Sequence, residues 1–357
     1  MQHLVYFPRT LMAVMSTITL SLMLQGCEQK QQPIKWDLQS QATASSIDYK
    51  ELVKMTENIK TMSAGRFLIR PHPGGEITDG PDIFNAVKSG KVEMGSGWPN
   101  WWSGQHPAWS VLNAGPFDFM NIDASLMYFI AGEGTKIANE LANPEGILWR
   151  AAWWPGMEFG LLSKKPILGI ADMKAMKVRI GPGLPSEVLA ATTGAYAIPL
   201  VPNEIKPSLE SNALDAVEWT TVAGAWNLGL NDIATHAIVP AIWQPSVLAD
   251  FLINQKAYQA LPKDLQAILE TAIKSYTLTT TAIAKVEDFE ALKAFKQNNT
   301  SIKQWSESDI ETWRHVSDEI LNQYKAANAL TKRLIESKQA FKKEYNAYYE
   351  LFGPYDN

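Results

Sequence analysis

The chain has 357 residues, of which 46% are hydrophobic and 19% charged, and its formal net charge is −5. This length allows two globular lobes with separate cores and excludes a single small module. The negative charge balance, without a basic stripe, excludes a nucleic-acid-binding surface. The 13 tryptophans are many for this length, so aromatic-lined pockets are expected.

The first 26 residues are predicted to be a signal peptide. The apolar run from Leu11 to Leu24 is too short for a permanent membrane helix and has the length of a secretory core region. The only cysteine, Cys27, follows Leu-Gln-Gly, which resembles a bacterial lipobox except at Gln25. We predict a lipidated Cys27 and a lipid-anchored tether over 27–33 in the periplasm. Ordinary cleavage and a structural cysteine are the alternatives.

From Ile34 onward, short apolar runs alternate with amphipathic stretches, which indicates an α/β fold. In chain order, strands are predicted over 35–41, 67–71, 91–95, 158–163, 176–180, 197–201 and 214–219. Helices are predicted over 49–62, 82–88, 187–193, 221–233 and 255–284. A last, nearly continuous helix is predicted from Ser306, as its N-cap, to Phe352. So long an amphipathic helix must pack across both lobes or on a second subunit.

Common catalytic motifs are missing from the sequence. It contains no HExxH, no CxxC and no phosphate-binding glycine loop, and its five histidines are scattered. Ser96 in Met-Gly-Ser-Gly-Trp lacks the spacing of a nucleophile elbow. The motifs therefore do not favour an enzyme.

Two charged residues break apolar strands. Arg179 lies within the predicted strand 176–180, and Glu218 closes the apolar run Leu-Asp-Ala-Val-Glu-Trp. A guanidinium binds a carboxylate through two parallel hydrogen bonds, so Arg179 could clamp an organic acid. A buried ion pair between Arg179 and Glu218 would explain both residues without any ligand. The residues alone leave both interpretations open.

A series of ordered motifs resembles the periplasmic solute receptors of TRAP transporters. These are GRFLIRPHPGGEI, AVKSGKVEMGSG, GQHPAW, LGIADMKAMKVRI, PNEIKPSLESNALDAVEW and DFLINQKAYQALPKDLQAIL. The resemblance extends from about Trp36 to Ala272 and is strongest to the branch that binds 2-oxo and 2-hydroxy monocarboxylates together with a metal ion.

The resemblance implies a two-lobe periplasmic binding protein fold of type II-like topology with long C-terminal helices. Lobe 1 is expected over 34–152 with part of 237–275, and lobe 2 over 153–236. The helical region 276–357 is expected to span the lobes or to form a dimer contact.

The resemblance also assigns the site. Arg179 would grip the ligand carboxylate, and Glu218 with the Trp219 carbonyl would hold a metal cation, either sodium or calcium, because hard cations prefer oxygen ligands. The Trp219 ring would pack against the ligand. Asn100 and Trp101 replace tyrosines that are common in relatives and would line the pocket.

Glu158 and Gln244 depart from the usual pattern of this branch. Glu158 stands where a Gln is usual and Gln244 where a Glu is usual, so a carboxylate and an amide are exchanged. We therefore expect both residues to remain ligands of the cation, with Glu158 also near the organic acid. Independent drift at two solvent-facing positions is the alternative.

The leading hypothesis is a receptor, not an enzyme, that captures a small 2-oxo or 2-hydroxy acid and delivers it to TRAP membrane subunits. Two alternatives stay open. One is a periplasmic metal-assisted enzyme that acts on a carboxylic acid, and the other is a receptor-derived sensory or partner-binding protein.

Overall fold

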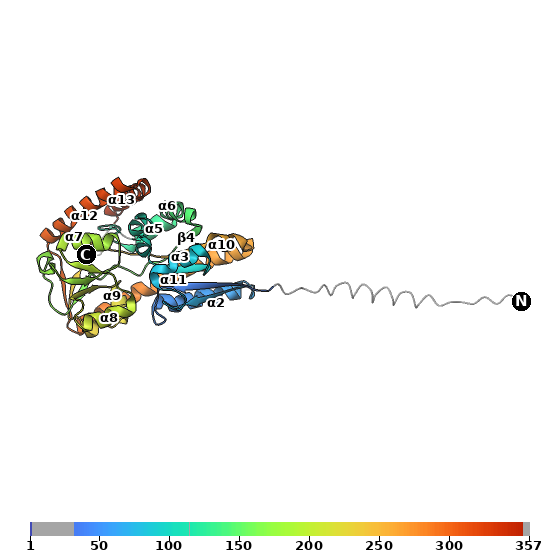
Figure 1. Cartoon of the computed structure of the whole chain (residues 1–357), viewed down its shortest axis with the longest axis horizontal. Coiled ribbons are helices and arrows are strands. Elements are labelled where there is room, and N and C mark those ends of the chain that lie inside the picture. Colours follow the sequence, from blue (N-terminus) through green and yellow to red (C-terminus); the bar gives the residue numbers. More distant parts are fainter. Residues whose placement is uncertain (2–31, 114, 353–357) are drawn as a thin grey trace.

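The computed structural model describes residue 1 and residues 32–113 and 115–352. Cys27 and nearly all of the predicted signal peptide lie outside the described residues. Within the described ranges, no helix is long and apolar enough to cross a membrane. Figure 1 shows the elements arranged in two lobes, with the C-terminal helices α12 and α13 along one side.

Lobe 1 is built on a five-stranded mixed sheet in the order β2-β1-β3-β10-β4. Strand β1 is parallel to β2 and β3, whereas β10 is antiparallel to β3 and β4. Its strands are β1 (Ile34–Ser40), β2 (Phe67–His72), β3 (Met94–Gly97), β4 (Ile147–Trp153) and β10 (Ala249–Asn254).

Lobe 2 is built on a six-stranded sheet in the order β11-β9-β5-β8-β6-β7. Strand β5 is antiparallel to its neighbours β8 and β9, and the other pairs are parallel. Its strands are β5 (Leu161–Ser163), β6 (Lys177–Arg179), β7 (Tyr196–Ile198), β8 (Ala216–Glu218), β9 (His236–Val239) and β11 (Ser301–Gln304).

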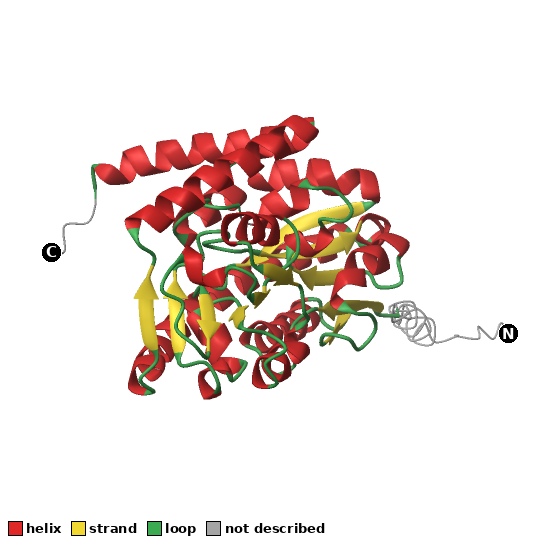
Figure 2. Ribbon diagram, turned by 60° about the vertical axis from the view of Figure 1, so that its left-hand side comes forward, coloured by secondary structure: helices red, strands yellow, loops and turns green. Residues whose placement is uncertain are grey.

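Helices cover both sheets, as Figure 2 shows. They are α2 (Ile47–Met62), α3 (Ile83–Ser89), α4 (Ala108–Asn113), α5 (Ile122–Ile130), α6 (Gly134–Ala142), α7 (Leu184–Thr193), α8 (Pro202–Glu210), α9 (Val222–Asn227), α10 (Gln255–Ala260), α11 (Lys263–Gln297), α12 (Glu307–Ala327) and α13 (Ala329–Glu350). Helix α2 buries Leu52, Met55 and Ile59, which recur at the spacing of one helix face.

Three connections join the two sheets. The chain crosses between β4 and β5, returns between β9 and β10, and crosses again along α11, which packs against α2 and β4 in lobe 1 and against α9 in lobe 2. The largest hydrophobic core contains Phe84 and Trp109 of lobe 1 together with Val178 and Leu184 of lobe 2. The two lobes are therefore held by a shared core as well as by the connecting chain.

The structure corrects three predicted helices. The predicted helix 255–284 is two helices because Pro262, which lacks an N–H, begins a new one. The predicted helix from Ser306 to Phe352 is interrupted at Asn328, whose extended backbone ends α12 and whose side chain accepts from the amides of the next turn. The helix predicted over 221–233 ends at Asn227. The Ser306 side chain caps α12 as expected.

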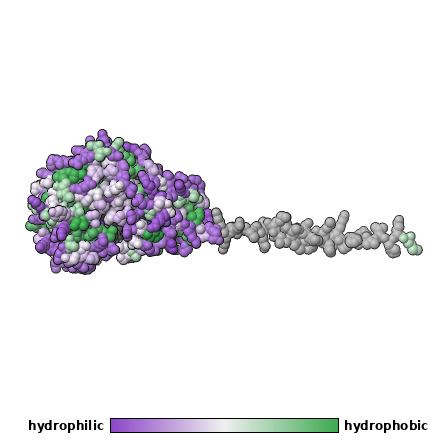
Figure 3. Space-filling view, in the orientation of Figure 1, coloured by the Kyte–Doolittle hydropathy of each residue, from purple (hydrophilic) through white to green (hydrophobic). Residues whose placement is uncertain are grey.

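The C-terminal region contacts both lobes within one chain. Helix α12 packs on α7 of lobe 2, and α13 packs on α4, α5 and α6 of lobe 1. This region, expected to be helical throughout, also contributes β11, which pairs with β9. Three of the four β11 residues are exposed, so no apolar alternation marked this strand in the sequence. Polar residues cover most of the face drawn in Figure 3, and apolar residues form small separate groups there.

Candidate ligand and cation site

A small inner cavity of about 30 Å³ lies where the lobes meet. This volume has room for an ion or for one or two water molecules. All seven side chains predicted as ligand or cation contacts line it: Asn100, Trp101, Glu158, Arg179, Glu218, Trp219 and Gln244. They come from both lobes and from the two segments that join β4 to β5 and β9 to β10, here called the hinge segments. The fold thus brings together residues that are distant in the sequence.

Strand β6 places Arg179 at its last position, inside the sheet of lobe 2, where the side chain is 3% exposed. The guanidinium donates from Nε and Nη2 to the Leu200 carbonyl, at 3.2 and 3.0 Å. Its Nη1 donates to the Glu218 carbonyl at 2.7 Å and to Glu218 Oε2 at 3.1 Å. Four hydrogen bonds to these two residues fix the guanidinium plane.

The Arg179–Glu218 ion pair that the residues allowed is therefore present, and Glu218 is also only 3% exposed. Glu218 is the last residue of β8, a neighbour of β6 in the sheet. Its Oε2 also accepts from the Gly181 amide at 3.4 Å, and its Oε1 accepts from Gln244 Nε2 at 3.4 Å. Both carboxylate oxygens are thus hydrogen-bonded to residues that line the inner cavity.

Glu158 and Gln244 lie on hinge segments that run side by side. The Glu158 amide donates to the Pro245 carbonyl at 2.9 Å, and Met157 forms an antiparallel bridge with Ser246. Both side chains are buried and line the inner cavity with Glu218. An exchange of carboxylate and amide between these positions therefore leaves the carboxylate beside the same cavity.

Two buried acceptor oxygens at this place are unsatisfied. Glu158 Oε2 and Gln244 Oε1 have no hydrogen-bond partner within the part of the chain that the structure describes. Burying such oxygens without a partner costs about 1–3 kcal/mol each, more for a charged group. A cation between them would supply the missing partner.

The charges of the site also favour a bound cation. Burial, then the negative charge of Glu218 and a hydrogen bond between the two carboxyl groups, raise the pKa of Glu158 well above its ordinary value, while Arg179 only partly opposes this. Burial lowers the pKa of Arg179. Two buried carboxylates face one guanidinium, so the site needs a second positive charge if Glu158 is to be ionised.

The donor set fits a hard cation. Among the described residues, no group of three or more His, Cys, Asp or Glu side chains could hold a metal ion. The available ligands are the carboxylates of Glu158 and Glu218, the amide oxygen of Gln244 and backbone carbonyls. This all-oxygen set suits sodium or calcium rather than a transition metal.

Trp219 and Asn100 close the cavity from opposite lobes. The Trp219 ring centroid lies 4.8 Å from Arg179 Cζ in a cation–π contact. Asn100 Nδ2 donates to the Pro182 carbonyl of lobe 2 at 3.2 Å, and Asn100 Oδ1 accepts from Asn113 at 3.1 Å. Trp101 is half-buried beside them.

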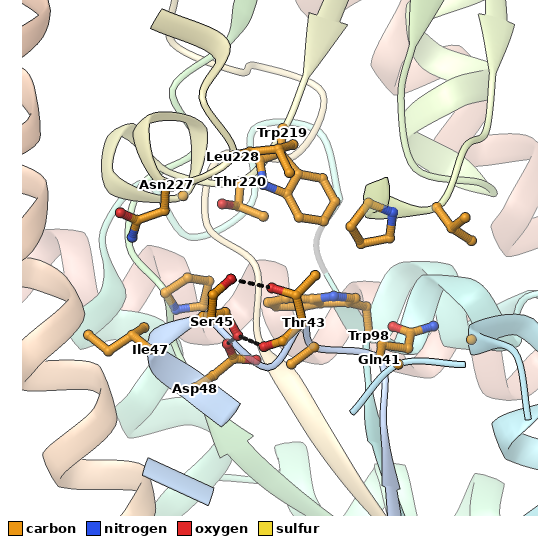
Figure 4. A pocket seen from close by; sticks show the side chains of 18 of the residues that line it. Gln41, Thr43, Ser45, Ile47, Asp48, Trp98, Trp219, Thr220, Asn227 and Leu228 are labelled. Carbon is orange, nitrogen blue, oxygen red and sulfur yellow. Dashed lines mark hydrogen bonds between the residues drawn. The ribbon is translucent and has the colours of Figure 1, made fainter. Parts of the chain in front are cut away.

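A larger space, here called the outer cleft, adjoins the inner cavity and has a volume of about 330 Å³. Figure 4 shows it between lobe 1, which contributes Gln41, Thr43 and Trp98, and lobe 2, which contributes Trp219 and Thr220. Most of its lining residues were not predicted as site residues. They lie on loops of ordinary polar composition that only the packing of the two lobes brings together.

The tryptophan-rich segments divide between cleft and core. Trp98, Trp101 and Trp153 line the outer cleft. Trp102 and Trp154 are buried, and their indole nitrogens donate to Asp250 and to Ser125 respectively.

Comparison with known proteins places this geometry in a family. Residues 38–327 match the DctP family, described as bacterial extracellular solute-binding protein, family 7. The chain belongs to this family. The predicted resemblance to TRAP solute receptors is thereby confirmed, and so is the two-lobe α/β fold, because this family-7 protein superimposes closely on solved TRAP solute-binding proteins.

Named relatives bind small organic acids. The family-7 chain is 28% identical over 294 residues, covering 82% of this chain and 80% of the relative, to the monocarboxylate 2-oxoacid-binding periplasmic protein of Nostoc sp. strain PCC 7120. It is 27% identical to a TRAP periplasmic solute-binding protein from Pseudoalteromonas atlantica solved with sodium and pyruvate, with a TM-score of 0.85 and coverage of 90% and 97%. It is also 27% identical to a TRAP periplasmic solute-binding protein from Colwellia psychrerythraea solved with calcium and pyruvate. The TM-score is 0.85, and the match covers 90% of this chain and 98% of the Colwellia protein.

Proposed function

We propose that this protein is the extracytoplasmic receptor of a TRAP transporter and binds a 2-oxo or 2-hydroxy monocarboxylate together with sodium or calcium in the inner cavity. The observation that carries the proposal is the unsatisfied pair Glu158 Oε2 and Gln244 Oε1, buried beside the Arg179–Glu218 ion pair. The ligands named for the Nostoc, Pseudoalteromonas and Colwellia proteins support the ligand class.

The residues that would hold the cation are Glu158, Glu218, Gln244 and the Trp219 carbonyl. When bound, the cation supplies the positive charge that the two buried carboxylates lack and an electrophilic partner for oxygens of the acid. Arg179 faces the same cavity and supplies its guanidinium to the carboxylate of the acid. Trp219, stacked on Arg179, limits water access to this charge pair.

Binding would favour the closed arrangement of the lobes. Asn100 already links lobe 1 to Pro182 of lobe 2, and an acid held between Arg179 and the hinge residues adds contacts across the same gap. A ligand that interacts more strongly with the closed than with the open state shifts the population toward closure.

A thermal-shift screen of 2-oxo acids, 2-hydroxy acids and dicarboxylates tests the receptor function. We expect 2-oxo or 2-hydroxy monocarboxylates to raise the melting temperature in the presence of Ca²⁺ or Na⁺. A hundredfold excess over Kd stabilises by about 2.7 kcal/mol, which shifts a protein of this size by several degrees. If none of the acids stabilises the protein under either ionic condition, the receptor proposal is wrong.

The metal-assisted enzyme is the second candidate from the sequence, and nothing at the inner cavity favours it. None of the described residues that line the cavity is a histidine, so the site lacks the most common general base at neutral pH. Incubation with the acids that bind, followed by mass spectrometry of the acid, should show no turnover.

The proposal also covers location and partners. The protein is exported to the periplasm, attached to the membrane through Cys27, and delivers its ligand to TRAP membrane subunits. It forms a homodimer through the C-terminal helices. The relatives named above are periplasmic proteins. Near the end of α13, Tyr348 and Phe352 are each 58% exposed and offer apolar surface to a second copy. Light scattering of the mature protein gives the oligomeric state, and mass spectrometry of its N-terminal peptide gives the state of Cys27.

A further inference from the structure

The outer cleft borders the inner cavity. Both spaces are lined by Trp98, Trp101, Trp219 and Thr220, so a substituent directed past these four residues from the inner cavity would enter the outer cleft. The charged groups suited to a carboxylate and a cation, Arg179 and Glu218, line only the inner cavity. The two spaces therefore differ in the part of a ligand that each can accept.

The sizes of the two spaces differ about tenfold. The inner cavity of about 30 Å³ has room only for small groups, such as a cation beside the polar head of an acid, whereas the outer cleft of about 330 Å³ has the volume of a small-molecule pocket. An acid as small as pyruvate leaves the outer cleft filled only with water. A ligand with a bulky substituent on the carbon chain uses both spaces.

The walls of the outer cleft are aromatic on both sides. Figure 4 shows Trp219 and Leu228 of lobe 2 above the space and Trp98 of lobe 1 below it. Trp98 packs against Trp153 with ring centroids 6.1 Å apart, which extends the aromatic floor. Such walls favour a flat apolar group, which gains both by leaving water and by stacking.

The charges of the outer cleft disfavour a second carboxylate on the ligand. Of the described residues that line it, none is Lys or Arg, and three are acidic: Asp48, Asp79 and Glu287. A distal carboxylate would lose hydration there and would meet like charges. A neutral substituent meets neither penalty.

We propose that the ligand of this receptor is a 2-oxo or 2-hydroxy monocarboxylate with an aryl or comparably bulky apolar substituent, whose substituent occupies the outer cleft between Trp98 and Trp219. This inference rests on the proposed function, because the acid head is placed in the inner cavity. It goes further in naming the substituent and the space that selects it.

Calorimetry with three acids tests the proposal on the wild-type protein in buffer with Ca²⁺. Phenylpyruvate is expected to bind at least tenfold more tightly than pyruvate, and 2-oxoglutarate more weakly than pyruvate. Equal binding of pyruvate and phenylpyruvate, or tighter binding of pyruvate or 2-oxoglutarate, overturns this inference and leaves the receptor function standing. Binding of none of the three overturns the receptor function itself.

A filling substitution tests the placement of the substituent. Thr43 is exposed and lines only the outer cleft, where its hydroxyl contacts Ser45 at 3.3 Å, so Thr43→Trp fills the cleft without removing a core contact. It should reduce the preference for phenylpyruvate over pyruvate to less than threefold. Thr61→Trp, the same change on the exposed face of α2, should retain the tenfold preference.

A second variant that fills the outer cleft from the opposite lobe keeps the test possible if Thr43→Trp does not fold. Asn227 is exposed at the end of α9 and lines the outer cleft. Asn227→Trp should reduce the preference in the same way. An undiminished preference in either folded variant overturns the placement of the substituent in the outer cleft.

Discussion

Arg179 Nη1 lies 3.1 Å from Glu218 Oε2, and both side chains are 3% exposed. A buried pair of this kind stabilises a protein little by itself, but the loss of one partner leaves an uncompensated charge. Here the pair lies beside a second buried carboxylate, Glu158. These charges form the proposed ligand site, and they also make the stability of the fold sensitive to the substitution of any one of them.

Arg179→Ala is expected to abolish acid binding and to lower the free energy of unfolding by about 3–5 kcal/mol, because Glu218 and Glu158 then lack their cationic partner. Denaturant unfolding followed by tryptophan fluorescence measures the stability, and calorimetry measures binding. The double variant Arg179→Met/Glu218→Met should recover much of the stability without recovering binding. Acid binding by either variant at near wild-type affinity would contradict the assignment of Arg179.

Glu158→Gln separates the effect of the Glu158 carboxylate on stability from its proposed role as a ligand of the cation. The pKa of Glu158 is raised well above its ordinary value of 4.5, mainly by burial. The folded protein therefore holds this proton more tightly than the unfolded chain, and the stability falls as pH rises through the window between 4.5 and the raised pKa. We expect Glu158→Gln to be more stable than the wild type at neutral pH without added cation.

The same variant should bind Ca²⁺ more weakly, because one of two carboxylate ligands is lost. Thermal melts with increasing Ca²⁺ give both quantities, since the melting temperature without cation reports stability and its rise reports binding. Glu270→Gln, which changes the carboxylate paired with Arg150 away from the cavity, is the control. A Glu158→Gln protein stabilised by Ca²⁺ as strongly as the wild type would exclude Glu158 as a ligand.

Some parts of this site could be predicted from sequence and others could not. Arg179 and Glu218 were visible because a charge within an apolar strand needs a partner. The sequence could not decide between a ligand clamp and an ion pair, since that depends on β6 and β8 being neighbours in the sheet. Glu158 and Gln244 could be assigned to the site only through the family resemblance. The two residues are 86 positions apart in the sequence, and they lie close together because their hinge segments pair side by side.

The fold was predictable to a similar degree. Strands with apolar character, such as β1 and β2, were expected at nearly their observed positions. Strand β11 is short and mostly exposed, so its position depends on pairing with β9 rather than on its own composition. The outer cleft could not be predicted, because it forms between loops of two lobes and no single segment carries its pattern.

Asp250→Asn tests a buried carboxyl outside the ligand site. Burial raises the pKa of Asp250 from 3.8 to about 7, although the Trp102 and Trp149 indole N–H groups donate to it. Because the folded state favours the protonated form, this group lowers stability as pH rises from about 4 to about 7. The amide cannot ionise, and its single oxygen can accept from both indoles.

The stability of Asp250→Asn relative to the wild type should therefore increase by a few kcal/mol between pH 4 and pH 7. Urea unfolding at several pH values measures the difference. Asp318→Asn, on an exposed position of α12, controls for the loss of one negative charge. A difference between Asp250→Asn and the wild type that stays constant over this pH range would refute the titration of Asp250.

Asn100→Ala tests the contact between the lobes. Asn100 supplies one hydrogen bond to Pro182 of lobe 2, and such a bond contributes about 1 kcal/mol. Its loss should weaken acid binding roughly fivefold to tenfold, because the closed state becomes less favourable. Asn143→Ala, an exposed position in lobe 1, should leave the dissociation constant unchanged. A dissociation constant for Asn100→Ala equal to that of the wild type would remove Asn100 from the closure contact.

The central claim is that an organic acid and a cation bind together beside Arg179. Its most direct test is calorimetric titration of protein from which bound acid and bound cation have been removed. Pyruvate and phenylpyruvate are titrated in sodium-free buffer with chelator, and the titration is repeated after adding Ca²⁺ or Na⁺. We predict at least a hundredfold tighter acid binding with one of these cations, and loss of that gain in Glu218→Gln. Acid binding of equal affinity with and without either cation would contradict the claim.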